Sequence, residues 1–517
     1  MFTKFILELL TKFYLISTDV DKKRIGGAIR MMTRASLLVT TALLLTGCVT
    51  STEEFSAADL RLIAGTTAQE AVADQTPVTA KIDLYEAMAR AIKYNLDTKV
   101  ESMEEALRIS ELDLRNYDVL PKLVASSGYT GRGSVDGAST ATRDRSYNDA
   151  DLTFSWNILD FGLSYVRAKQ AGDKVWIQRE IKRKVVNRST EDVRTAYWRA
   201  VTYDRLSGRM RALSAKVKTA LGETRSLAAN GNTSPIAALS YERELLQIQR
   251  ELEILLGQLQ TAKSQLAALM NLLPHEQYNL VIPDRKPMNL GVSSDYKKLY
   301  LTALEIRPEM RQLAYELRIN DRELDAQLLQ LLPGLQLYAG TNFDSNSFLQ
   351  ESNWIGWGAK ASWNMLRLFS IPSTKRTIEA QEDLLHARSM SVAMAIMTQV
   401  HVSRVRFLHA RRELGTASEL AVVQRKLLSQ VKNEQLAERT SMQVLLREEM
   451  NSIVTESKLD MVYADLQNAY ANLYASLGVD PFPKGMSSTD PLPEMSAKLR
   501  TMWMARGKKP EIVLTSN

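Results

Sequence analysis

The chain has 517 residues, of which 45% are apolar and 24% charged, and its formal net charge is +7. A single cysteine, Cys48, excludes an internal disulfide, and only four histidines leave few ligands for a zinc or iron–sulfur centre. We therefore expect no metal and no cofactor. The length allows two or three domains or one elongated repeat, and the composition favours long helices.

Residues 1–47 have the organisation of a secretory signal peptide, with Met31 or Met32 as an alternative start. Arg34 precedes an apolar run over 37–45 that is too short to span a bilayer as a helix. The ending Leu45-Thr46-Gly47-Cys48 resembles a bacterial lipobox, in which the cysteine becomes the lipidated first residue. Cys48 is thus predicted to carry acyl chains such as palmitate. The alternative is a free buried cysteine after an ordinary signal peptide.

Most of the positive charge belongs to this segment. Removing residues 1–47 leaves 59 basic and 56 acidic residues, a net charge of +3. Nucleic-acid binding usually needs a concentrated basic face, so no nucleic-acid partner is expected. Val49 follows Cys48, whereas an Asp at that place commonly signals inner-membrane retention of lipoproteins. Its absence favours the outer membrane.

The first half of the mature chain predicts a tether, helices and two strands. Residues 48–80 are polar and small and predict an extended tether, and helical signal over 82–117 ends before Pro121. Strands are expected near 122–132 and 149–159, because apolar and polar residues alternate over 151–158. In an outer-membrane protein, the apolar face of such a strand contacts lipid and the polar face lines a watery lumen.

Two long helices are expected next, over 164–229 and 235–273, with a turn at 230–235. Apolar residues recur at alternating spacings of three and four, which is the pattern of a heptad seam. A helix of about 65 residues would be about 100 Å long at 1.5 Å per residue. It must therefore lie along partner helices rather than inside a compact domain.

The second half repeats the first. Leu120-Pro121-Lys122-Leu123 returns as Leu332-Pro333-Gly334-Leu335, and Ser155-Trp156-Asn157-Ile158-Leu159 returns as Ser362-Trp363-Asn364-Met365-Leu366. Repeat 1 is assigned to residues 81–275, an inter-repeat connection to 276–300, repeat 2 to 301–480 and a C-terminal tail to 481–517. Repeat 2 is expected to contain strands near 334–344 and 355–366 and long helices over 373–435 and 441–478.

The fold class is therefore mainly α with a β-barrel portion, built from a duplicated helix, strand, strand, long helix, helix unit. Four strands per chain cannot close a membrane barrel, because closed barrels need about eight or more and a spanning sheet must have no open edge. The chain must then oligomerise, and three protomers would supply twelve strands.

In this arrangement the two halves resemble TolC-like outer-membrane efflux channels, in the lipidated branch of that family. The likeness covers about residues 81–480 and lies in short motifs, each weak alone. They are Ile82-Asp83-Leu84-Tyr85-Glu86-Ala87 with Tyr94-Asn95-Leu96, its echo over 303–309, Leu-Pro at 120–121 and 332–333, Trp156-Asn157-Ile158-Leu159-Asp160-Phe161-Gly162, and Leu473-Tyr474-Ala475-Ser476-Leu477-Gly478.

The resemblance implies a homotrimer with a twelve-stranded transmembrane barrel and a coiled-coil helical tunnel across the periplasm. Its partners would be a periplasmic adaptor (membrane fusion) protein, an inner-membrane pump and the outer-membrane lipid. The function would be a passive gated conduit in a tripartite efflux or type I secretion system. The competing hypothesis is a lipid-tethered periplasmic coiled-coil adaptor or scaffold without a pore.

The resemblance also implies functional tips at the helix–turn–helix ends, where the family docks its adaptor. The candidate adaptor contacts are Gly231, Asn232, Thr233, Ser234, Arg439, Thr440 and Ser441. Small and polar residues there suit a tight turn, so the alternative is that they only reverse the chain.

Family channels close their periplasmic end with Arg, Tyr and Asp. Here Arg439-Thr440 matches the family's Arg-Thr, but Glu434 stands at the tyrosine position. Ala237, Gln443 and Leu446 replace the aspartates. The expected latch is Arg439 with Glu434 or Glu438, either of the same chain or of a neighbouring protomer. Glu448 and Glu449 are expected to form a displaced acidic collar.

The alternating segments supply candidates for the barrel. The lumen candidates are Ser155, Asn157, Lys360 and Asn364, and the lipid-facing aromatic candidates are Phe154, Trp156, Trp357 and Trp363. No nucleophile and base are brought together by any motif, so the chain is not expected to be an enzyme.

Overall fold

The computed structural model describes residues 54–73, 75–131, 144–230, 234–273, 276–285, 295–483, 485–487 and 489–508, with the backbone alone for 159–161, 507 and 508. The chain divides into two units, Met1–Glu70 and Ala71–Asn517, and each is described by itself. Cys48 and the signal peptide lie outside the described residues, as do Gly231, Asn232 and Thr233.

The described part of the first unit contains most of helix α3 (Ala57–Ala71). The expectation of an extended tether over 48–80 is therefore wrong for this stretch. Ser56 and Asp59 form a reciprocal capping box, in which the Asp59 N–H donates to Ser56 Oγ at 3.2 Å and the Ser56 N–H donates to Asp59 Oδ2 at 3.2 Å. Good helix formers such as Ala and Leu follow this start signal.

The second unit contains two copies of one element order. The first copy comprises α4 (Leu84–Tyr94), α5 (Leu96–Tyr117), β1 (Lys122–Gly131), β2 (Ser146–Asn157), α6 (Ile158–Ala229) and α7 (Pro235–Leu269). The second comprises α8 (Tyr296–Ile306), α9 (Pro308–Leu329), β3 (Gly334–Asp344), β4 (Asn353–Ser362), η2 (Met365–Ser370), α10 (Ile371–Leu436) and α11 (Met442–Ser476), and α12 (Leu492–Lys508) follows. The predicted fold class, mainly helical with a small sheet in a duplicated unit, is confirmed.

Each copy opens with a short helix that breaks into a longer one at a single residue. Asn95 breaks the first pair with an extended backbone of φ −60° and ψ 126°, and its side chain caps α5 by accepting from the Thr98 N–H. Arg307 breaks the second pair with φ −63° and ψ 136°, and Pro308 begins α9. The same local geometry therefore recurs 212 residues later, the offset that separates Pro121 from Pro333.

The four strands form one antiparallel sheet in the order β1-β2-β3-β4. The hydrogen-bonded register joins Leu152 to Thr341 between the two copies, so the repeats share one sheet. The ends of the strands lie within a few residues of the predicted ones. Trp363 and Asn364 fall outside β4, which ends at Ser362, so their predicted placement on a strand is wrong. Asn364 instead precedes the 3₁₀ turn η2.

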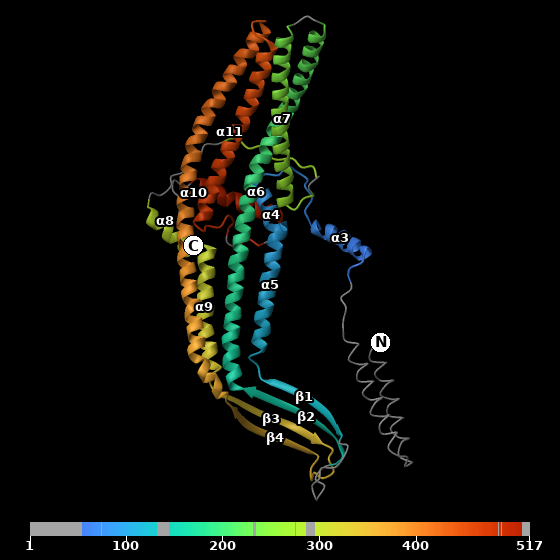
Figure 1. Ribbon diagram of the computed structural model, residues 1–517, viewed down its shortest axis with the longest axis vertical. Coiled ribbons are helices and arrows are strands. Elements are labelled where there is room, and N and C mark those ends of the chain that lie inside the picture. Colours follow the sequence, from blue (N-terminus) through green and yellow to red (C-terminus); the bar gives the residue numbers. More distant parts are fainter. Residues whose placement is uncertain are drawn as a thin grey trace. The chain divides into compact units, whose positions relative to one another are not determined.

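The long helices pair as antiparallel hairpins, α6 with α7 and α10 with α11, and α11 also packs on α6 (Figure 1). An apolar seam holds them together: Leu206, Met210 and Leu213 of α6 pack with Leu446 and Met450 of α11. The end of α6, the start of α7 and the α10–α11 turn lie away from the sheet (Figure 1). At 1.5 Å per residue, the 72 residues of α6 are about 110 Å long, as the heptad pattern requires.

Candidate functional site

The sheet has two faces of opposite chemistry. Residues paired across antiparallel strands share a face, and successive residues alternate. Ser155 pairs with Tyr338, and Gln336 pairs with both Asn157 and Lys360, so the lumen candidates Ser155, Asn157 and Lys360 lie on one face. We call this the polar face.

The candidates Phe154, Trp156 and Trp357 lie on the opposite, apolar face, because Phe154 and Trp357 both pair with Ala339. The apolar face is exposed in the part of the chain that the structure describes: Trp357 is 82% exposed and Ile355 is 74% exposed. A row of large exposed apolar side chains on a sheet demands another apolar phase or partner.

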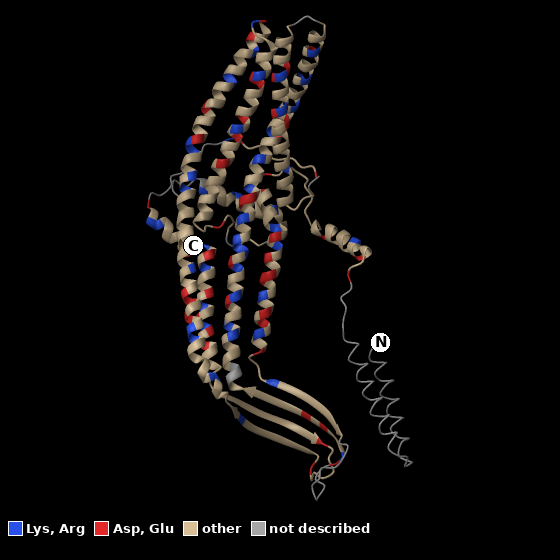
Figure 2. Cartoon of the chain, in the orientation of Figure 1, with Lys and Arg blue, Asp and Glu red and all other residues tan. Residues whose placement is uncertain are grey.

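Charge within the sheet is confined to the polar face. The five charged strand residues are Lys122, Asp149, Asp151, Asp344 and Lys360, and the register places all of them there. The two lysines lie at the helix-side end and the three aspartates toward the other end. Figure 2 shows how sparse these charges are compared with the helices. Lys360 was predicted to line the lumen and the alternation over 151–158 contains Asp151, whereas Lys122, Asp149 and Asp344 were not singled out from the sequence.

A tyrosine covers a glycine on the polar face. A Cβ built on Gly358 would lie 2.6 Å from the Tyr338 hydroxyl and 2.8 Å from its Cζ, because the ring crosses this position from the neighbouring strand. The absence of a side chain at Gly358 thus fixes where the Tyr338 ring lies on that face.

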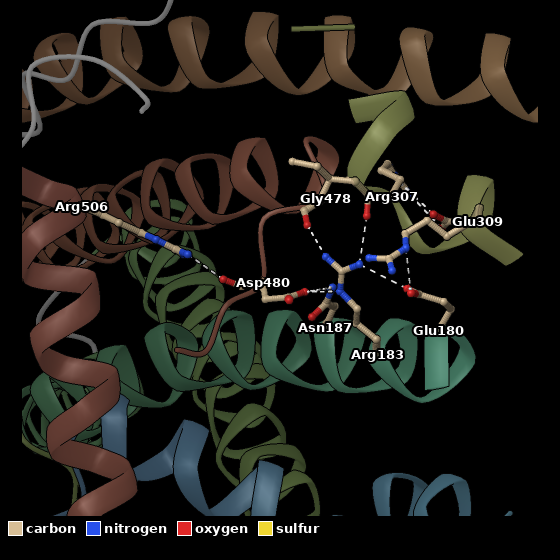
Figure 3. Close-up of polar contacts among 10 residues, drawn as sticks. Glu180, Arg183, Asn187, Arg307, Glu309, Gly478, Asp480 and Arg506 are labelled. Atoms are coloured by element: carbon tan, nitrogen blue, oxygen red, sulfur yellow. Dashed lines mark hydrogen bonds and ion pairs between the residues drawn. The ribbon is translucent and has the colours of Figure 1, made fainter. Parts of the chain in front are cut away.

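A partly buried polar cluster ties the two repeats together near the end of α11 (Figure 3). Arg183 of α6 donates to Asp480 Oδ1 at 2.7 Å, to the Gly478 carbonyl at 2.7 Å and to the Ile306 carbonyl at 2.9 Å. Burial lowers the pKa of Arg183, but the carboxylates of Asp480 and Glu180 outweigh it and raise the pKa above its usual value. One side chain of repeat 1 thus satisfies carbonyls from two elements of repeat 2.

Arg307 extends this cluster. Its guanidinium forms a bidentate pair with Glu309 at 2.9 and 3.0 Å and also donates to Gln399 Oε1 at 2.7 Å. Glu180 accepts from Arg183 at 3.2 Å and lies 3.0 Å from Arg311 Nε. Arg307 was quoted from the sequence only as part of a motif, and no pattern assigned it this position.

Three ion pairs join α6 to α11 in a ladder. Lys216 lies 2.7 Å from Glu449, and Arg209 and Arg205 pair with Glu456 and Asp460. From Lys216 to Arg209 to Arg205, the residue number along α6 falls by seven and then by four. From Glu449 to Glu456 to Asp460, the residue number along α11 rises by seven and then by four. This is the register of antiparallel helices packed through one heptad-like stripe. The ladder joins repeat 1 to repeat 2.

The structure separates the gate candidates. Among the described contacts, no ion pair joins Arg439 to Glu434 or Glu438, and Glu434 instead accepts from Gln430 Nε2 at 3.1 Å. Only the backbone connects the expected latch, because the Arg439 N–H donates to the Glu434 carbonyl at 2.8 Å. The latch is thus not formed within one chain, and the version with a neighbouring protomer stays a prediction.

The expected acidic collar is divided as well. Glu449 pairs with Lys216 and also lies 3.8 Å from Lys432, so its charge is neutralised within the chain. Glu448 accepts from Gln424 Nε2 at 2.8 Å and from Asn451 Nδ2 at 3.1 Å. Glu449 therefore belongs to the ladder.

The second tip is a Schellman turn. The Arg439 N–H donates to the Glu434 carbonyl and the Glu438 N–H donates to the Gln435 carbonyl at 2.9 Å, with Glu438 in the left-handed region at φ +57°. Ser441 then caps α11 by accepting from the Val444 N–H at 3.4 Å. Arg439 and Ser441 are exposed and Thr440 is half-buried. Ser234, the described member of the first tip, precedes Pro235 at the start of α7.

The tips also expose apolar side chains that were not predicted. Ile236 and Leu239 of α7 are 79% and 65% exposed, and Leu436 of α10 is 80% exposed.

Among the described residues, no cluster of His, Cys, Asp or Glu has the grouping needed to hold a metal ion. None of the described helices combines the length and the apolar character needed to cross a membrane.

Several solved outer-membrane channels have this fold. CmeC of Campylobacter jejuni matches with a TM-score of 0.64 and 13% identity over 83% of this chain and 95% of CmeC. VceC of Vibrio cholerae matches with a TM-score of 0.60 and 12% identity over 76% of this chain and 96% of VceC. MtrE of Neisseria gonorrhoeae, solved in its open state, matches with a TM-score of 0.60 and 14% identity over 77% of this chain and 89% of MtrE.

These likenesses confirm the predicted resemblance to TolC-like outer-membrane efflux channels at the level of the fold. No protein-family model matches the chain. No curated protein matches it either. The assignment to the lipidated branch stays a prediction.

Proposed function

We propose that the chain is the outer-membrane channel component of a tripartite efflux or type I secretion system. It would form a passive, gated conduit from the periplasm to the outside and catalyse no reaction itself. The observation that carries the proposal is the four-stranded sheet, which has an exposed apolar face, a charged polar face and two open edges. A protein alone in water would have to cover such a surface.

The direction of the strands supports closure by identical copies. The four strands alternate in direction, so the free edges of β1 and β4 belong to strands that run in opposite directions. Copies arranged around an axis would therefore continue the antiparallel pairing from β4 of one protomer to β1 of the next. Three copies give a homotrimer with a twelve-stranded barrel, within the range of closed membrane barrels.

In this proposal the polar face lines the lumen and the apolar face contacts lipid. Ser155, Asn157 and Lys360 would then meet the passing solute, and Phe154, Trp156 and Trp357 would contact the bilayer. The chain would lie in the cell outer membrane, anchored by lipid on Cys48, with its helices in the periplasm.

The tips would contact the periplasmic adaptor, which links the channel to an inner-membrane pump. The proposed contacts are Gly231, Asn232, Thr233, Ser234, Arg439, Thr440 and Ser441. The exposed apolar side chains Ile236, Leu239 and Leu436 support this assignment, because apolar groups form the core of most interfaces.

We propose that Arg439 acts in gating through a carboxylate of a neighbouring protomer, such as Glu434 or Glu438. Glu448 would also lie near the closed end.

Conductance and crosslinking test the proposal. The detergent-extracted protein should conduct ions in planar bilayers. Single cysteines on the polar face of β1 (Val124, Ser126) should be combined with single cysteines on the same face of β4 (Gly356, Ser362), in a background without Cys48. At least one pairing should yield disulfide-linked species up to a trimer. Pairs on the non-adjacent strands β1 and β3 serve as the control and should not crosslink.

The pore-free adaptor hypothesis predicts different results. Removal of Cys48 would then give a water-soluble monomer, with no conductance and no crosslink between β1 and β4. That combination would refute the channel.

A further inference from the structure

A groove of about 520 Å³ lies where the sheet joins the helices, between the last turns of α9 and the start of α10. Gln327, Leu328 and Leu331 of the α9 end line one side. Arg367 of η2 and Ile371 and Lys375 of α10 line the other. The floor is thus apolar and two cations stand at its rim.

The groove favours an anion. None of its described lining residues is acidic, whereas Arg367 and Lys375 are both exposed. Lys375 lies 3.5 Å from Glu379, one turn further along α10, but both side chains are more than half exposed. Such a surface pair contributes little free energy, so Lys375 can exchange Glu379 for a phosphate at small cost.

An exposed apolar segment adjoins this groove. Trp363, directly after β4, donates its indole N–H to the Leu331 carbonyl at 2.9 Å. In η2, Leu366 is 77% exposed and Phe369 is 83% exposed, with Arg367 between them. Apolar side chains that alternate with a cation are typical of segments that lie at the level of lipid headgroups.

The two repeats differ here. At the offset of 207 that aligns Trp156 with Trp363, Asp160 corresponds to Arg367 and Ala168 corresponds to Lys375. The first copy therefore carries neither cation, and it passes from β2 into α6 without a 3₁₀ turn. The groove is a property of repeat 2 rather than of the duplicated plan.

We propose that this groove binds an anionic phospholipid from the membrane leaflet that adjoins the helices. The phosphate lies between Arg367 and Lys375, and an acyl chain follows Leu328 and Phe369. The inference rests on the proposed function for one point, that the sheet spans the outer membrane and so places its helix-side end at the periplasmic leaflet. The lipid orients repeat 2 at that interface.

Native mass spectrometry of the full-length channel, released from detergent and titrated with dioleoylphosphatidylglycerol, tests the site. The double variant R367Q/K375Q should bind this lipid at least fivefold more weakly than the wild type. The matched control R406Q/K426Q removes two exposed cations from α10 far from the groove and should bind like the wild type. Dioleoylphosphatidylcholine should be retained less than the anionic lipid by the wild type.

Three outcomes would overturn the site. Equal retention of both lipids, or unchanged lipid binding in R367Q/K375Q, would show that Arg367 and Lys375 do not hold the phosphate. Full displacement of the lipid by millimolar inorganic phosphate would show that the apolar floor takes no part. A lower temperature of subunit dissociation in R367Q/K375Q with unchanged lipid binding would assign the groove to a second copy of the chain. Conductance of the same preparation reports separately on the proposed function.

Discussion

Gly478 ends α11 in the left-handed region, at φ +78°, where its N–H donates to the Ala475 carbonyl at 2.9 Å. An added Cβ would also lie 3.0 Å from the Arg307 backbone nitrogen. We expect Gly478→Ala to destabilise the fold by about 3 kcal/mol, from backbone strain and a contact that cannot relax. Thermal unfolding followed by circular dichroism measures this loss.

Gly485 provides the matched control. It has nearly the same φ, +79°, but nothing lies within 4 Å of its Cβ position. Gly485→Ala should therefore cost only the strain, about 1 kcal/mol. Equal losses in the two variants would show that the contact with Arg307 is unimportant.

Glu438 occupies the left-handed position of the α10–α11 turn, at φ +57°, where glycine is preferred. Glu438→Gly should raise the free energy of unfolding by about 1 kcal/mol, because it relieves this strain. Glu438→Ala removes the same charge but keeps the strain, so it should give no gain. A gain in both variants would assign the effect to the carboxylate.

At the residue scale, the sequence predicted which side chains share a face and missed most of the charged ones. Ser155 and Trp156 were assigned correctly to opposite faces, because the alternation of a strand is written in consecutive residues. Lys122 and Asp344 required the register between strands. Arg183 was missed because Asp480 and the two carbonyls that it binds lie more than 100 residues away in the chain.

At the scale of elements, the ladder between α6 and α11 should make stability depend on pH. Burial raises the pKa of Glu456, but Arg209 and Arg285 outweigh it and hold the pKa below its usual value of 4.5. A carboxyl with a lower pKa in the folded state stabilises the fold above the unfolded pKa, and this contribution disappears as the pH falls below about 4.5.

Glu456→Gln should therefore lower the free energy of unfolding at pH 7 by about 1 kcal/mol, the value for a partly exposed ion pair, and lower the melting temperature with it. Between pH 6 and pH 4, the melting temperature of this variant should fall less than that of the wild type. Thermal unfolding at both pH values measures the difference. Glu253→Gln, on the exposed side of α7, should leave the pH dependence unchanged. An identical pH profile for Glu456→Gln and the wild type would contradict this role.

The element boundaries show where sequence patterns lose information. β3 matches its predicted bounds, whereas α6 begins at Ile158 rather than 164, because β2 passes into the helix without a loop. Gly162 favours a break when it is taken alone, yet it continues the helix. η2 was not predicted, since short 3₁₀ turns have no periodic signal.

For the whole molecule, the polar face predicts selectivity in the proposed trimer. The register places Asp149 directly opposite Asp344, with Asp151 two residues further along β2. Adjacent like charges are unfavourable in a sheet unless water or cations screen them. Three copies would form a ring of acidic groups in the lumen and should favour cations.

Asp149→Asn combined with Asp344→Asn should reduce this preference, measured as a shift of the reversal potential toward zero in a KCl gradient across a planar bilayer. Lys360→Gln, at the other end of the same face, should shift the potential in the opposite direction or leave it unchanged. A reversal potential that neither variant alters would show that the lumen lies elsewhere.

The unequal spacing of the ladder has a mechanical consequence. If α11 slid along α6 by one turn, Lys216 would face Ile453 or Leu445, and at most one of the three pairs could re-form. Equal steps would have allowed several stable positions, but steps of seven and four allow one. Any opening between the two hairpins should then proceed by separation or rotation about their long axes, in which the three ion pairs break together, and not by gradual sliding.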